Sequence, residues 1–178
     1  MAKQYVGGIL STIQELTALT NQTHDSYKRL VPGFEAPVYT SWSYTNNADL
    51  VRVPQHKPEM GMSARVEYRV PDSACNPYLA FAAVLAAGLE GIEQRYELPM
   101  AAERPANEMS EAERAARNIV LLPNSLGEAI TAFEGSALMR ATLGDSMCDS
   151  LVANKRHEWR EYRAQVTPFE VARYLPAL

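Results

Sequence analysis

Residues 65–70 read RVEYRV and place an acid between two arginines at every second position: Arg65, Glu67 and Arg69. Because side chains alternate between the two faces of a β-strand, this spacing predicts that the three charged groups project to one side of a sheet. The positions between them are apolar or aromatic: Val66, Tyr68 and Val70. These are predicted to face a core. Charged residues on strands also commonly face water, so the spacing alone leaves both interpretations open.

Two upstream segments carry further charged side chains. The loop SYKRLVPGFEAP, residues 26–37, holds Arg29 and Glu35 beside apolar residues, which suits recognition of a small anionic substrate. A loop that merely happens to be charged is the alternative. Arg52 lies on a predicted strand that ends at Pro54. The alternative interpretation is that Arg52 is an ordinary surface arginine.

Residues 29–69 thus contain four arginines, together with Glu35 and Glu67. Phosphate and carboxylate groups are bound best by planar, bidentate, permanently charged donors, which is the strength of arginine over lysine. A divalent cation that bridges phosphates needs hard oxygen ligands, and Glu67 could be one. Because catalysis of phosphoryl transfer is mostly positioning and charge neutralisation, the set predicts a site for phosphate, a carboxylate substrate and a metal ion.

Other chemistries find little support in the sequence. There is no glycine-rich phosphate loop of either common type. His24, His56 and His157 are isolated, with no metal-ligand spacing, and no serine stands in a nucleophile elbow. The net charge of −4 and the absence of a Lys/Arg block argue against a nucleic-acid partner.

The sequence also bears on the compartment. The two cysteines, Cys75 and Cys148, form no redox or metal pair, and the N-terminal residues lack the shape of a signal peptide. The most apolar stretch, residues 78–92, is too short to span a bilayer. We therefore expect a reducing, cytoplasmic setting without a membrane partner.

The pattern of elements predicts an α+β fold, with antiparallel strands in the first half packed with a helical C-terminal half. Strands are expected at 37–45, 49–54 and 64–70, the first two joined by a turn at Asn46-Asn47. Helices are expected at 3–19, from Pro77 after an Asn76 cap, and at 146–165 with an apolar stripe of Met147, Leu151, Trp159, Tyr162 and Val166. Capping signatures stand at 110–113, 125–128 and 167–170, the last opening a short terminal helix. Residues 20–37 are expected to form a loop, and the small residues of the second helix suggest that it packs on a sheet.

The segments NQTHDSYKRLVPGFEAPVYTSWS and RVEYRVPDSACNPYLAFAAVLAAGLEGI closely resemble the C-terminal part of the catalytic domain of glutamine synthetase. The resemblance extends over nearly the whole chain, and its motif, S-Y-K-R-L-x-P-G-x-E-A-P followed by R-x-E-x-R and N-P-Y, is highly specific. It implies one segment of that domain over residues 1–178, with a site region at about 20–72 and a helical region at about 76–175. Members of this family join ammonia to glutamate through a γ-glutamyl phosphate made from ATP, with Mg²⁺ or Mn²⁺.

The resemblance also implies roles for single residues. Arg29 would hold the glutamate carboxylate, and Glu35 would lie on a flap that closes over the substrate and helps to deprotonate ammonium. Arg52 and Arg65 would contact ATP phosphates, with Arg52 also taking part in catalysis. Glu67 would be a metal ligand. Arg69 would bind glutamate or the transferring phosphate.

One departure from the family pattern concerns Asn47, which stands where members usually have an arginine of the ATP or glutamate site. It leaves open a ligase for polyamines or other amines. Members are also more than twice as long, so the resemblance implies a C-terminal segment that is inactive when isolated, and a ring dodecamer only for the full-length protein. A non-catalytic relative that retains the fold is the other alternative.

Overall fold

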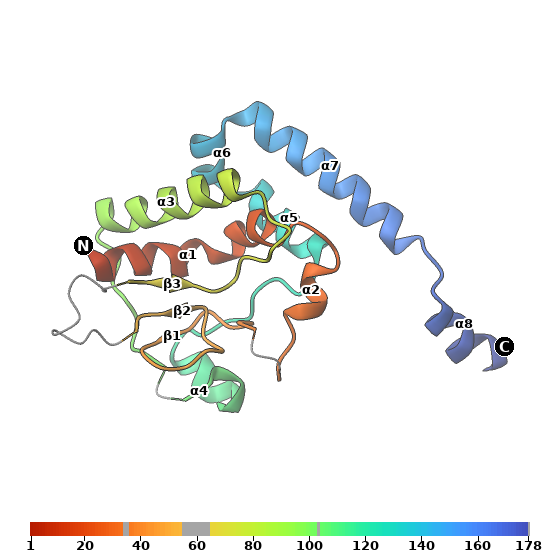
Figure 1. Ribbon diagram of the computed structural model, residues 1–178, viewed down its shortest axis with the longest axis horizontal. Helices are drawn as coiled ribbons and strands as arrows, with labels where there is room; N and C mark the ends of the chain where they lie inside the picture. Colours follow the sequence, from red (N-terminus) through yellow and green to blue (C-terminus); the bar gives the residue numbers. More distant parts are fainter. Residues whose placement is uncertain (34–35, 55–64, 103, 178) are drawn as a thin grey trace.

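The computed structural model describes residues 1–33, 36–54, 65–102 and 104–177, and Figure 1 traces their course. The expected α+β class is confirmed: helices surround a small three-stranded sheet. The N-terminal half contains α1 (Ala2–Thr20), α2 (Ser26–Arg29), β1 (Trp42–Ser43), β2 (Val51–Arg52) and β3 (Glu67–Tyr68). The rest contains α3 (Pro77–Glu93), α4 (Glu111–Ala116), α5 (Leu126–Glu134), α6 (Ala137–Leu143), α7 (Asp145–Arg163) and α8 (Pro168–Tyr174), with short 3₁₀ turns at Ala106–Glu108 and Leu175–Ala177.

Helix α1 is the centre of the core. Its apolar positions follow the helical period, and Ile9, Ile13 and Leu16 are almost completely buried. Helix α3 lies along α1 in Figure 1. The expectation that its small residues pack on the sheet is therefore wrong. The reason is a close backbone contact: a Cβ on Gly8 would lie 2.1 Å from the carbonyl oxygen of Ala87. Only glycine permits this approach.

The sheet has the order β1-β2-β3. Strands β2 and β3 are antiparallel, as expected, with Arg52 opposite Glu67. Strands β1 and β2 run parallel, so the expected hairpin across Asn46-Asn47 is wrong. Local bonds bend the chain there instead: the Ser43 hydroxyl accepts from the Asn46 amide, and the Asn46 side chain accepts from the Ala48 amide.

The end of α1 is fastened to the end of β3. The Asn21 side chain, which is completely buried, donates through Nδ2 to the carbonyl oxygen of Val70 at 3.1 Å. The Asp72 amide donates to the Thr20 carbonyl oxygen. The Tyr27 hydroxyl, on α2, donates to the Asn21 carbonyl oxygen at 2.9 Å. The segment expected to be a loop therefore contains a one-turn helix that is held against the strand.

The alternation expected along the third strand holds in part. Val70 is completely buried and Tyr68 is half-buried, as predicted. Val66 is 39% exposed, because the regular strand β3 begins only at Glu67.

The helix caps follow the sequence closely. Asn76 accepts from the amides of Tyr78 and Leu79, and capping boxes form at Ser110–Glu113 and Thr167–Glu170. At 125–128 only half of the box forms, because the Glu128 carboxylate accepts from the Asn124 amide instead. None of the helices in the described ranges is both long enough and apolar enough to cross a membrane.

Helix α7 extends from the body of the molecule toward α8, as Figure 1 shows. Its buried residues are Cys148 and Val152. The predicted stripe is therefore wrong at its two ends, since Met147 and Val166 are 48% and 75% exposed. The physical reason is that α7 packs mainly against α5 and α6, and its two ends lie beyond these contacts.

Candidate functional site

The register of β2 and β3 brings Arg52 and Glu67 together. These two residues face each other across an antiparallel pair, where side chains of the same face are neighbours. Arg52 Nε donates to Glu67 Oε2 at 2.7 Å, and Arg52 Nη2 donates to Oε1 at 3.1 Å. This is a bidentate pair, the geometry that gives arginine its selectivity for carboxylates and phosphates.

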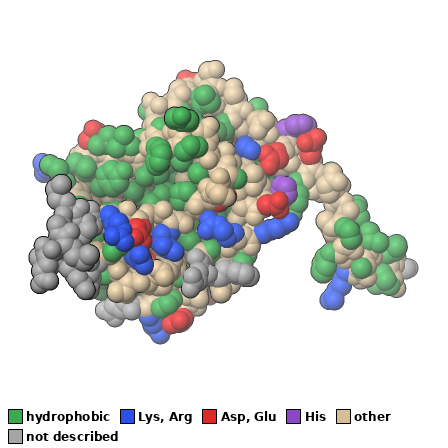
Figure 2. All heavy atoms as spheres, in the orientation of Figure 1, with side chains coloured by type: hydrophobic (Ala, Val, Ile, Leu, Met, Phe, Trp, Pro, Cys, Tyr) green, Lys and Arg blue, Asp and Glu red, His purple; other side chains and the backbone are tan. Residues whose placement is uncertain are grey.

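Two more arginines reach the same carboxylate. Arg65 Nε donates to Glu67 Oε1 at 2.8 Å, and Arg69 Nη1 lies 3.8 Å from Oε2. In Figure 2, basic side chains gather around an acidic one over this part of the sheet. We call Arg52, Arg65, Glu67 and Arg69 the strand cluster. The prediction that the charged groups of residues 65–69 share one side of the sheet is confirmed.

The strand cluster carries more positive than negative charge, with three guanidinium groups and one carboxylate. Hydrogen bonds from Arg52 and then Arg65 hold the pKa of the Glu67 carboxyl below its ordinary value. The carboxylate therefore stays ionised and keeps the guanidinium groups in place. The surplus charge makes this face attractive to an anion.

Asn47 lies within the same site. Arg52 Nη1 donates to the Asn47 side-chain oxygen, and Arg69 Nε donates to the Asn47 backbone oxygen at 2.9 Å. Asn47 thus contacts two arginines of the strand cluster. Asn47 consequently lies where it can affect both.

Arg29 approaches from another element. It is the last residue of α2, and its Nη2 donates to the Val70 carbonyl oxygen at 2.6 Å. Because Val70 directly follows Arg69, the structure places Arg29 at the end of the strand that carries the cluster. Glu35, the predicted flap residue, lies outside the described residues.

A divalent metal does not fit the described residues by themselves. Glu67 offers one carboxylate, and both of its oxygens accept hydrogen bonds from arginines. Within the described ranges no three His, Cys, Asp or Glu side chains are grouped as metal ligands. Mg²⁺ binds through one or two carboxylates only when substrate phosphates and water complete its shell.

Sequence reasoning missed a second group of arginines. Arg156, Arg160 and Arg163 lie on one face of α7, and with Trp159 they line a cavity of about 690 Å³ between α5 and α7, away from the strand cluster. We call these three residues the helical arginine cluster. Their spacing of four and three residues was a readable signal for a shared helix face. The position of the opposing helix, α5, could not be predicted from the sequence.

The fold and the strand cluster define an anion-binding α+β unit, in which short strands beside two packed helices present arginines around one carboxylate. The chain belongs to the glutamine synthetase catalytic-domain family, because a family model described as "Glutamine synthetase, catalytic domain" matches residues 1–174. Glutamine synthetase of Mycolicibacterium smegmatis is 48% identical over 98% of this chain. That of Halobacterium salinarum is also 48% identical over 98% of the chain, and that of Thermotoga maritima is 44% identical over 97%.

The similarity extends to a solved structure titled "GmaS/ADP complex-Conformation 1". It is 32% identical to this chain, covers 98% of it, and gives a TM-score of 0.84. The chain spans about 39% of the length of these proteins.

Proposed function

We propose that this chain is the C-terminal segment of the catalytic domain of an ATP-dependent ligase that joins glutamate to ammonia through γ-glutamyl phosphate. The observation that carries the proposal is the strand cluster, in which Arg52 and Arg65 clasp Glu67 beside Arg69. Family membership supplies the reaction class. A neighbour whose title names an ADP complex supports use of a nucleotide.

In this proposal the arginines divide the anionic groups between them. Arg52 and Arg65 bind ATP phosphate oxygens, with Arg52 also assisting the transfer, and Arg69 binds glutamate or the transferring phosphate. Arg29 holds the glutamate carboxylate. These groups neutralise and orient the reacting oxygens, which is the main source of catalysis in phosphoryl transfer. Glu35 deprotonates ammonium at the flap.

Glu67 positions the arginines that would bind phosphate. In the structure it fixes Arg52 and Arg65, so the phosphate must compete with a carboxylate for the same N–H donors. In the whole protein, where other residues would complete the metal shell, Glu67 would be a ligand of Mg²⁺ or Mn²⁺.

An alternative acceptor has one specific observation in its favour. Asn47 contacts Arg52 and Arg69, at a position where the resemblance to glutamine synthetases implies an arginine. A neutral amide there changes the charge around the reacting groups, which would suit a glutamate ligase for polyamines or other amines. In either case we expect the whole protein to form a homo-oligomer, with the ring dodecamer of the family. A non-catalytic relative would have no use for the strand cluster.

The test is a chimeric enzyme. Residues 1–174 replace the matching segment of the 48%-identical M. smegmatis glutamine synthetase, and ATP-dependent γ-glutamyl hydroxamate formation is measured. We expect activity in the chimera, a loss of about 100-fold or more in Glu67→Gln, and no loss in Glu161→Gln, which changes an exposed carboxylate on α7. Equal activity of the two variants would remove the strand cluster from the site. An assembled but inactive chimera would contradict the ligase proposal.

The 178-residue chain alone is expected to be inactive. It carries one predicted metal ligand among its described residues, and losing positioning groups removes many orders of magnitude of rate. The same assay on the purified chain checks this. Turnover clearly above that of Glu67→Ala would show that the site is complete without further residues.

A further inference from the structure

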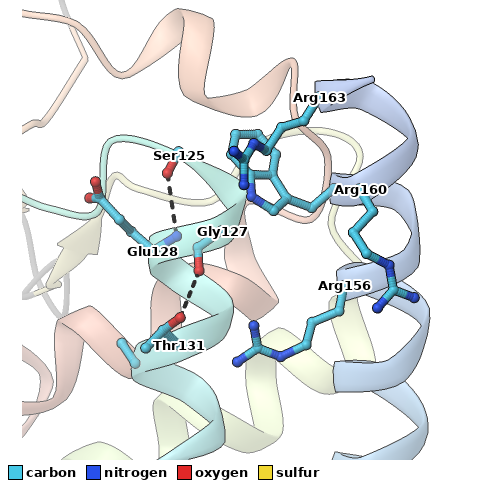
Figure 3. Close-up of a pocket in the computed structure, with 9 residues that line it drawn as sticks. Ser125, Gly127, Glu128, Thr131, Arg156, Arg160 and Arg163 are labelled. Carbon is cyan, nitrogen blue, oxygen red and sulfur yellow. Dashed lines mark hydrogen bonds between the residues drawn. The ribbon is translucent and has the colours of Figure 1, made fainter. Parts of the chain in front are cut away.

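Near its C-terminal end, helix α7 is contacted by a second segment of the chain. Figure 3 shows α7 opposite α5, with Arg160 and Arg163 on its last turn. His24, in the turn before α2, stacks its ring on that of Tyr162 of α7, with 4.1 Å between the ring centres and 25° between the planes. Tyr162 stacks in turn on Trp159. The imidazole of His24 is therefore part of the contact that holds the end of α7 against the segment before α2.

The two nitrogens of the His24 ring face carboxylates from different parts of the chain. Nε2 lies 3.4 Å from Asp25 Oδ1, and Nδ1 lies 3.9 Å from Glu158 Oε1 on α7. The side chains of His24 and Glu158 are 30% and 32% exposed, whereas that of Asp25 is 65% exposed. Water and salt therefore screen the contact with Glu158 less, and this is the contact that joins two elements of the fold.

A neutral imidazole cannot satisfy both carboxylates, because it carries one N–H donor and one lone pair. In either tautomer, one ring nitrogen of His24 directs its lone pair toward a carboxylate. Nδ1 is shut off from water and has no hydrogen-bond partner among the described residues. The imidazolium form has two N–H donors, one for each carboxylate, so binding of a proton improves both contacts at once.

Two lysines complete the charged groups around His24. Lys28 Nζ lies 2.9 Å from Asp25 Oδ1, the same oxygen that faces His24, and together they hold the pKa of the Asp25 carboxyl below its ordinary value, Lys28 by a hydrogen bond and His24 by its charge. Lys155 Nζ lies 2.8 Å from Glu158 Oε2 and leaves Oε1 to His24. The contact across the two elements thus has an acceptor oxygen of its own.

We propose that His24 is a proton-sensitive contact, which holds the end of α7 against the segment before α2 when its imidazole is protonated and weakens when the proton leaves. Histidine is the side chain that ordinarily changes charge between about pH 5 and 8, so the contact responds in the physiological range. Because the docked state binds the proton better, docking strengthens as the pH falls through this range and weakens as it rises. Helix α2 ends at Arg29 and α7 leads to α8, so the contact couples proton binding to the position of the C-terminal helices. It is independent of the ligase proposal.

The experiment follows the indole ¹H–¹⁵N resonances of the full chain by NMR between about pH 8 and about pH 5. Trp159 reports on the end of α7 because it stacks on Tyr162, while Trp42, which is buried beside the sheet, is the internal reference. His24→Phe keeps an aromatic ring for the stack but cannot bind a proton. His157→Phe is the matched control, since it removes an exposed histidine of α7 whose ion-pair partner lies on the same helix.

A second pair of variants tests the carboxylate of α7. Glu158→Gln removes the acceptor that faces His24, and Glu161→Gln removes an exposed carboxylate one turn further along the helix. Hydrogen exchange of the backbone amides of residues 160–163, corrected for the intrinsic effect of pH, measures how firmly the end of α7 is held.

In the wild type, His157→Phe and Glu161→Gln, we expect the Trp159 resonance to titrate while that of Trp42 stays in place. The corrected exchange of residues 160–163 should slow by about threefold or more toward the acidic end. Both responses should be lost in His24→Phe and clearly reduced in Glu158→Gln. A Trp159 titration that survives His24→Phe, a response in Glu158→Gln equal to that of the wild type, or exchange that becomes faster toward acidic pH would each overturn the proposal.

Discussion

The molecule holds two arginine clusters that are built in different ways. In the strand cluster, three guanidinium groups converge on one carboxylate, Glu67. In the helical arginine cluster only Arg156 has a carboxylate partner among the described residues. The first cluster is therefore held in place before any ligand arrives, and a ligand must compete with Glu67. In the second, Arg160 and Arg163 are exposed and have no carboxylate partner in the part of the chain that the structure describes.

The supports of the two clusters differ as well. The strand cluster depends on β2, β3 and their attachment to α1 and α2 through Val70. The helical arginine cluster depends on one helix, and on Trp159 resting against Gly127. Long-range contacts thus fix the first, while helical spacing and one close contact fix the second. The following predictions separate these supports, from the largest expected effect to the smallest.

The largest effect is expected from Asn21→Ala, which removes the bond between α1 and β3. Asn21 is completely buried, so its loss leaves polar groups without a partner and opens a small cavity. We expect the free energy of unfolding to fall by about 1–3 kcal/mol. Gln22→Ala is the matched control, because among the described residues the Gln22 side-chain amide donates only to the nearby Leu19 carbonyl oxygen of α1. Urea unfolding of both variants is the measurement, and equal losses would contradict the role of the Val70 bond.

Asn47→Arg tests how the strand cluster selects its substrate. An arginine would add a permanent charge and a planar fork beside Arg52 and Arg69. In the chimeric enzyme we expect a change of roughly tenfold in KM or kcat, equivalent to about 1.4 kcal/mol. A native glutamine-forming enzyme should gain, whereas a ligase specialised for another amine should lose its own reaction.

The assay for Asn47→Arg uses ammonia and a panel of amines, with Asn47→Ala as the control that removes the amide without adding charge. If no acceptor responds to either substitution, then Asn47 does not influence the reacting groups, despite its contacts with the two arginines.

The sequence predicted the strand cluster better than its surroundings. Alternation at Arg65, Glu67 and Arg69 is a local property, so the period of two was enough to place them on one side. The bidentate bond from Arg52 depends on strand register, which a single sequence does not encode locally. The direction of β1 was mispredicted for a different reason: local side-chain bonds at Ser43 and Asn46 bend the chain where a hairpin turn was expected.

For the helical arginine cluster, the helix itself could be predicted but its packing partner could not. A long helix was expected at 146–165, and α7 is found at Asp145–Arg163. What could not be read from the sequence was that α5 would lie opposite Trp159, because this depends on how α6 turns the chain between the two helices. A helix face can be predicted to line a cavity only when the helix that packs opposite it is known.

A smaller effect is expected from Gly127→Ala, which acts on the support of the helical arginine cluster. Alanine in a helix ordinarily stabilises a protein by up to about 1 kcal/mol relative to glycine. Here the new Cβ would lie 2.4 Å from Trp159 Nε1, so the indole must move and that gain should be lost. Thermal unfolding and tryptophan emission are the measurements.

The control for Gly127→Ala is Gly135→Ala, where the nearest atom would be 3.8 Å away. Trp42, which is buried and donates to the Pro99 carbonyl oxygen, should give an unchanged contribution to the emission. A Gly127→Ala protein that is stabilised with unaltered emission would show that Trp159 does not rest on α5.

The smallest effect concerns the acid titration of Glu67. Its pKa lies below the ordinary value because Arg52 and then Arg65 donate hydrogen bonds to the ionised form. A folded-state pKa below the unfolded one contributes stability at pH values above the unfolded pKa, and this contribution is lost as the pH falls through the folded value. An NMR titration of the Glu67 carboxyl carbon should therefore show a low midpoint that rises in Arg52→Gln and stays in place in Arg160→Gln. A midpoint indifferent to Arg52 would mean that the bidentate pair does not persist in solution, and the contrast between a preorganised cluster and an open one would be lost.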